Sequence, residues 1–222
     1  TIDPIQNTLK SGLVAYYPFN GNTFDVSGNN FHGIPSQITM TSDRNNETGK
    51  AIYLTGTSFV EIAHDNKFNG EMTSISVWYN TQSYTDNGQG NQRLMVSKRD
   101  PSGWGGGYEI GLNNSNGPGI HASWTNSGGN NAIVYSNNLN TNQWYHYVYV
   151  HDRNSVRLYL NGTLVTEMAN TGMLTSNNLP TRIGQRPNGW HPYIGKIDDI
   201  GIWNRALTAQ EVNYLYRNNF QP

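Results

Sequence analysis

Residues 195–203 read Gly-Lys-Ile-Asp-Asp-Ile-Gly-Ile-Trp, an apolar strand that carries two adjacent carboxylates. Residues 12–22 read Gly-Leu-Val-Ala-Tyr-Tyr-Pro-Phe-Asn-Gly-Asn, a second apolar strand that runs into a turn rich in side-chain oxygens. A charge inside a strand needs a donor, an opposite charge or a metal ion, because burying it alone costs several kcal/mol. The turn is the candidate for the other half of such a site, so the sequence predicts that the first and last strands lie side by side.

Three internal segments have the apolar pattern that is typical of inner strands. They are residues 74–79 (Ser-Ile-Ser-Val-Trp-Tyr), 142–150 (Asn-Gln-Trp-Tyr-His-Tyr-Val-Tyr-Val) and 156–162 (Val-Arg-Leu-Tyr-Leu-Asn-Gly). In this order and spacing, the segments resemble the laminin-G-like, concanavalin A-like jelly-roll domains of secreted bacterial proteins, especially those that handle polysaccharides. The resemblance covers nearly the whole chain and implies an all-β, antiparallel two-sheet jelly-roll sandwich. It leaves the activity open, because this fold hosts lectins, adhesins, lyases and hydrolases.

Length and charge set the domain count and exclude some partners. A chain of 222 residues fits one all-β sandwich, and we expect this domain over residues 11–217, with polar linkers at 1–10 and 218–222. Such linkers fit a module of a larger secreted or cell-surface protein. Only 13% of the residues are charged and the net charge is -1, so we expect no nucleic-acid binding. No apolar run is long enough to cross a bilayer, so we expect no membrane insertion.

Period-two alternation dominates the chain and predicts strands. In residues 144–150, the even positions hold a tryptophan, a histidine and valines, whereas the odd positions hold three tyrosines. We expect the even face in the core and the tyrosines as an aromatic stripe on the other face. One short C-terminal helix is predicted, because Thr208 followed by Glu211 is a capping box and Val212 with Leu215 gives an apolar edge.

The turn and the carboxylate pair together suggest a calcium site. Calcium prefers oxygen ligands from carboxylates, amides and carbonyls, and the resemblance implies a structural calcium ion between the chain ends. By strand parity, Asp198 is expected to point inward with Ile200, and Asp199 to point the other way. The alternative is a polar clasp without metal, in which Asp25 and Asp198 accept hydrogen bonds. The predicted calcium ligands are Asn20, Asn22, Asp25, Asn29 and Asp198.

Two tryptophans in predicted loops suggest a carbohydrate site. Sugars stack their C–H faces on aromatic rings and pair their hydroxyls with polar groups. Trp104 lies in a glycine-rich loop, and Trp190 lies between Pro187 and Pro192, which would stiffen its loop. The predicted ligand-binding residues are Trp104, Trp190, His191, Arg186 and Asn126. The other four tryptophans, Trp78, Trp124, Trp144 and Trp203, lie in predicted strands and are expected to be packing residues.

These features favour a non-catalytic carbohydrate-binding or adhesion module whose partner is a polysaccharide or glycan. A glycosidase needs two positioned carboxylates, and here the acidic residues are either isolated or adjacent, so we expect no enzyme. The alternative is a protein-interaction or spacer module without glycan affinity. A polysaccharide lyase that acts through His146 and the tyrosines of residues 145–149 is the third possibility.

Overall fold

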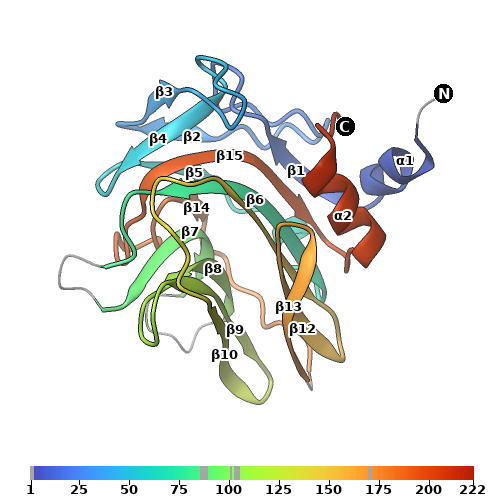
Figure 1. Ribbon diagram of the computed structural model, residues 1–222. Helices are drawn as coiled ribbons and strands as arrows, with labels where there is room; N and C mark the ends of the chain where they lie inside the picture. The colour runs from blue at the N-terminus through green and yellow to red at the C-terminus, as the bar shows by residue number, and fades with distance from the viewer. Residues whose placement is uncertain (1–2, 86–89, 101, 103–105, 170–171) are drawn as a thin grey trace.

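The computed structural model describes residues 3–85, 90–100, 102, 106–169 and 172–222. Two antiparallel sheets face each other (Figure 1), as the sequence predicts. The eight-stranded sheet has the order β13 (Thr163–Ala169), β12 (Ser155–Leu160), β11 (Tyr145–His151), β6 (Thr73–Thr81), β15 (Ile194–Trp203), β4 (Ala51–Thr55) and β3 (Thr39–Thr41), and β1 (Leu13–Tyr17) also pairs with β15. The seven-stranded sheet has the order β10 (Gly129–Ser136), β9 (Gly119–Asn126), β8 (Gly107–Asn113), β7 (Gln92–Arg99), β14 (Thr181–Ile183), β5 (Phe59–Ile62) and β2 (Ile34–Ser36). A short 3-10 helix, η1 (Asn66–Phe68), precedes β6.

The first and last strands pair, which confirms the prediction from the two terminal segments. Tyr16 lies opposite Gly201 and Tyr17 lies opposite Ile200 in an antiparallel ladder. The other half of β15 pairs with β4, and β6 lies along its opposite edge. The strand that carries the carboxylate pair is therefore held by β1, β4 and β6.

A β-bulge in β15 overturns the predicted parity of the two aspartates. Between Asp198, opposite Trp78, and Gly201, opposite Ser76, β15 holds one residue more than β6. Asp199 adopts a left-handed backbone with φ of 46° at this point, and such an extra residue re-aims the side chains around it. Ile197, Ile200 and Ile202 all lie in the core between the sheets. Both aspartates instead contact the Arg44 side chain, so Asp198 does not point inward as expected.

The two faces of β11 have the opposite roles to those predicted. Tyr145, Tyr147 and Tyr149 belong to the main core between the sheets, whereas Val148 and Val150 belong to a second apolar cluster. This second cluster also holds Trp203 and residues of the two helices, and Figure 1 shows α2 (Ala209–Arg217) over this side of the eight-stranded sheet. The valine face is apolar because a helix covers it.

The C-terminal helix α2 begins as predicted. Thr208 is its N-cap, and the capping box with Glu211 is complete. The described parts of the segments expected as linkers, residues 3–10 and 218–222, pack against the sandwich instead. Helix α1 (Pro4–Lys10) begins at the N-cap Asp3, and its Leu9 is fully buried. At the other end Phe220 is buried, and the Gln6 side-chain amide donates to the Gln221 carbonyl oxygen at 3.0 Å.

Candidate functional site

The outer face of the seven-stranded sheet carries a buried ion-pair cluster around Glu109. Glu109 lies on β8 between Ser97 and Ser123 of the neighbouring strands, and its side chain is 1% exposed. Arg186 donates to the two carboxylate oxygens at 2.7 and 3.0 Å, and Arg99 contacts one of them at 3.4 Å. Burial opposes ionisation of Glu109, but the two guanidinium groups hold its pKa below the usual range. The cluster therefore stays charged at neutral pH and fixes Arg186 in place.

Arg186 opens the loop over residues 185–193, which displays Trp190. Within the loop, the Arg186 amide donates to the Trp190 carbonyl at 3.0 Å, and the Gly189 amide donates to the Arg186 carbonyl at 2.8 Å. The Leu94 amide of β7 donates to the His191 carbonyl at 2.8 Å, which attaches the loop to the sheet. The Trp190 side chain remains 54% exposed. The structure thus presents a largely exposed indole on a loop tied down at both ends.

The five residues predicted to bind a ligand are only partly brought together. Arg186, Trp190 and His191 share this loop, and Arg186 is committed to Glu109. Asn126 is buried at the end of β9, where its side-chain oxygen accepts a hydrogen bond from the Gly128 amide at 2.8 Å, so it belongs to the β9–β10 turn. Trp104 lies outside the described residues. The ion-pair role of Glu109 was not predicted, because Arg186, which makes its shortest contacts, lies 77 residues further along the chain.

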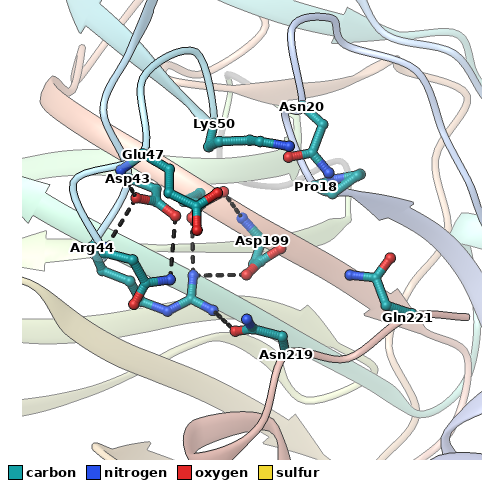
Figure 2. Close-up of a pocket in the computed structure, with 11 residues that line it drawn as sticks. Pro18, Asn20, Asp43, Arg44, Glu47, Lys50, Asp199, Asn219 and Gln221 are labelled. Atoms are coloured by element: carbon teal, nitrogen blue, oxygen red, sulfur yellow. Dashed lines mark hydrogen bonds and ion pairs between the residues drawn. The ribbon is translucent and has the colours of Figure 1, made fainter.

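A second candidate site is a polar pocket of about 150 Å³ beside β15 (Figure 2). It is lined by Pro18 and Asn20, by five residues of the loop 43–50, by the two aspartates of β15, and by Asn219 and Gln221 of the C-terminal tail. Figure 2 shows the guanidinium of Arg44 reaching from the loop toward Asp199 and Asn219. Arg44 lies 2.9 Å from Asp198, 2.7 Å from Asp199 and 2.7 Å from the Asn219 side-chain oxygen. One cationic side chain thus joins the loop, the last strand and the tail.

The carboxylate pair holds protons more tightly than isolated aspartates do. Burial and the charge of Asp199 raise the pKa of Asp198 to about 8, although Arg44 acts in the opposite direction. Burial also raises the pKa of Asp199, against the effects of Arg44 and of the hydroxyl of Tyr16, which donates to Asp199 at 2.9 Å. With both carboxyls ionised the pair and Arg44 carry a net charge of -1, and with one carboxyl protonated, which the raised pKa values favour, they are neutral together.

The five predicted calcium ligands do not converge on one ion. Asp25 is 5% exposed, and its oxygens accept hydrogen bonds from the amides of Tyr16, Ser27 and Phe31 at 2.8 to 3.0 Å. The side-chain oxygen of Asn29 accepts from the Lys67 ammonium at 2.8 Å.

The remaining predicted ligands are also used elsewhere or separated from Asp25. The side-chain oxygen of Asn22 accepts from the Phe24 amide at 2.9 Å. Asn20 and Asp198 line the polar pocket, where Arg44 already binds Asp198. Within the described part of the chain, no three His, Asp or Glu side chains are grouped to hold a metal ion. The predicted ligand set does not fit calcium, and Asp25 forms the polar clasp that the sequence left as the alternative.

Removal of metal ions by chelation tests whether the protein binds calcium. We expect the melting temperature to be the same in EDTA as in millimolar calcium, because hydrogen bonds and Arg44 satisfy the candidate ligands. Differential scanning fluorimetry of metal-stripped protein measures this. A calcium-dependent rise of several degrees would show that an ion binds the native state.

Comparisons with known proteins show what the chain is similar to. The sequence profile of the concanavalin A-like lectin/glucanases superfamily matches residues 54–213, most of the chain. The chain belongs to this superfamily. A comparison with curated proteins gives no match. Within the described residues, no helix is long and apolar enough to cross a membrane.

Solved structures share the superfamily fold. Domain 4 of AbnA, an extracellular arabinanase from Geobacillus stearothermophilus solved with arabinotriose, is 23% identical with a TM-score of 0.71, over 92% of this chain and 98% of that domain. The binding domain of Paraclostridial Mosquitocidal Protein 1 is 20% identical with a TM-score of 0.73, over 94% of this chain and 52% of that one. The binding domain of botulinum neurotoxin serotype D is 14% identical with a TM-score of 0.70, over 96% of this chain and 52% of that one. The chain spans about half of each toxin domain, and at these identities the likeness concerns the fold.

Proposed function

We propose that this chain is a non-catalytic carbohydrate-binding or adhesion module of a larger secreted or cell-surface protein. The observation that carries the proposal is the Trp190 indole, 54% exposed on a loop that is closed by its own hydrogen bonds and fixed by the Arg186–Glu109 ion pair. Because the loop backbone is already fixed, it loses little conformational freedom when a sugar ring stacks on the indole. His191 lies beside it, with its ring centroid 6.0 Å from that of Trp190.

The related structures support binding as the activity and an extracellular setting. The arabinanase domain was solved with a bound trisaccharide, and the two toxin fragments are binding domains. The arabinanase is extracellular. The full coverage of one domain of a multidomain arabinanase fits a module that works beside others.

Side-chain positions argue against catalysis. His146 is buried against Ser76, and burial lowers its pKa to about 3. Tyr147 and Tyr149 face the core on the other side of the strand, where burial raises their pKa values far above the usual range. The acid and base of the lyase hypothesis are therefore on opposite faces of β11. The buried carboxylates Glu109, Asp198 and Asp199 are held by arginines.

Replacing Trp190 with alanine tests the proposal. We expect glycan affinity to fall about tenfold or more, because a stacked indole is a typical binding hot spot, while Trp190→Phe retains part of the affinity. Affinity gel electrophoresis against a panel of plant and marine polysaccharides measures this, with Phe24→Ala as a matched change at an exposed ring elsewhere. Binding that is indifferent to Trp190→Ala would remove this loop from the site.

A protein-interaction or spacer role is the second candidate. It is favoured by three exposed apolar side chains within residues 24–34, because such groups mark contact surfaces when they cluster. Phe24, Val26 and Ile34 are 56%, 45% and 67% exposed. Failure of the wild-type chain to bind any polysaccharide in the panel would favour this role.

A further inference from the structure

A second concave surface lies on the outer face of the eight-stranded sheet, beside the end of α2. It has a volume of about 520 Å³ and is lined by Trp78, Trp144 and Tyr216 together with arginines and asparagines. We call it the aromatic groove. Small-molecule sites usually measure roughly 300 to 1,000 Å³, so the groove has room for a saccharide. It adjoins the polar pocket of Figure 2, because Arg44, Asn45 and Asn219 line both.

The rings of the groove come from three separate elements. Trp78 lies on β6, between His146 of β11 and Asp198 of β15. Tyr216 of α2 stacks on it, with centroids 5.7 Å apart and planes 21° apart. Trp144 directly precedes β11. Trp78 and Trp144 were predicted to be packing residues, but both are only partly buried, unlike the fully buried Trp124 and Trp203.

Trp78 and Tyr216 are held in position before any ligand arrives. The guanidinium carbon of Arg44 lies 4.5 Å from the centroid of Trp78, and the His146 ring lies 5.0 Å away. Arg44 is itself fixed by the two aspartates of β15 and by Asn219. Aromatic platforms that are fixed in this way bind sugar rings without a large ordering cost.

The polar lining of the groove has one sign of charge. It contains the guanidinium groups of Arg44 and Arg217 and the amides of Asn45, Asn218 and Asn219, with no carboxylate among the described lining residues. Arg44 is neutralised by the aspartates beneath it, whereas exposed Arg217 makes no ion pair with any described residue. A free guanidinium offers the planar pair of donors that suits a carboxylate or a sulfate group.

We propose that the aromatic groove is a second saccharide site and that it takes an anionic sugar, with the ring against Trp144 and Tyr216 and the acidic group at Arg217. This inference rests on the proposed carbohydrate-binding function and adds a site and a ligand class to it. The groove lies on the eight-stranded sheet, whereas Trp190 lies on a loop over the seven-stranded one.

Isothermal titration with three oligosaccharides tests the site: an oligogalacturonate for the carboxylate, a sulfated galactan oligosaccharide for the sulfate, and neutral arabinotriose. We expect Trp144→Ala and Arg217→Gln each to weaken binding of at least one anionic saccharide about tenfold, with added salt reducing the wild-type affinity. Lys10→Gln is the matched control, because Lys10 is an exposed base in the last turn of the other helix. Melting temperatures establish that each variant is folded.

The outcomes separate this inference from the function on which it rests. Loss of anionic binding in both groove variants, with Lys10→Gln unchanged, supports the groove. If wild-type protein binds saccharides and both groove variants retain full affinity, the proposal that the groove is a saccharide site is overturned, and the proposed function stands. If the groove variants lose neutral and anionic sugars equally, the anionic preference is overturned. If the wild type binds no saccharide, the proposed function and the groove both fall.

Discussion

Replacement of Glu109 by glutamine is expected to lower the free energy of unfolding by about 3 to 5 kcal/mol, the usual cost of removing one partner from a buried ion pair. Glutamine has nearly the same shape but no charge, so Arg99 and Arg186 would face each other without a counterion. Their side chains are only 10% and 13% exposed, which leaves little solvent to screen them. Urea denaturation measured by intrinsic fluorescence gives this free energy.

A matched substitution separates this effect from the general cost of losing a carboxylate. Glu61 pairs with Arg182 at 2.8 Å on the same sheet, but its side chain is 35% exposed. Glu61→Gln is therefore expected to cost less than about 1 kcal/mol. Equal losses for Glu61→Gln and Glu109→Gln would contradict the role given to the buried cluster.

Arg44→Leu is expected to cost about 3 kcal/mol at pH 8, because the two aspartates of β15 would lose their only described cationic partner. The same change removes the ring contact on Trp78 and the hydrogen bond to Asn219. Arg153→Leu is the control, since its pair with Glu71 is exposed to solvent, and a loss below about 1 kcal/mol is expected there.

The cost of Arg44→Leu should depend on pH. Burial and Asp199 raise the pKa of Asp198 from 3.8 to about 8, so the folded state binds this proton more tightly than the unfolded state does. The resulting stabilisation is complete below about pH 4 and is lost as the pH rises through 8. Without Arg44 the folded pKa rises further, so the variant should lose more stability at pH 9 than at pH 5. Denaturation curves at both values check this, and an equal cost at both would contradict it.

Local and repetitive signals in the sequence predicted the fold well. The pairing of β1 with β15 was predicted correctly from two apolar terminal segments, although their polar groups do not form one shared site. The capping box of α2 needs only Thr208 and Glu211. Helix α1 was missed although Asp3 followed by Pro4 is a helix-start signal, because the surrounding polar composition suggested a linker. The core face and the outer face of β11 were predicted the wrong way round, because alternation does not show which face a helix will cover.

The sites depend on contacts between distant segments, and there the sequence was less informative. The bulge at Asp199 arises from the pairing of β15 with β6, so counting residues along β15 alone gave the wrong parity. Arg44 is 154 residues from Asp198, and no local pattern connects them. The Trp190 loop was predicted because its prolines and its Asn-Gly turn lie within seven residues. The aromatic groove was not predicted, because its three rings come from a strand, a loop and a helix.

The contact between Gln6 and the carbonyl of Gln221 brings the two extremities of the described chain to one place. A short glycine-serine bridge between them should therefore close the polypeptide into a ring without disturbing the sheets, and new ends could be opened at the exposed turn near Asn142. Ring closure restricts the unfolded ensemble, so the cyclised protein should resist heat better than the linear one.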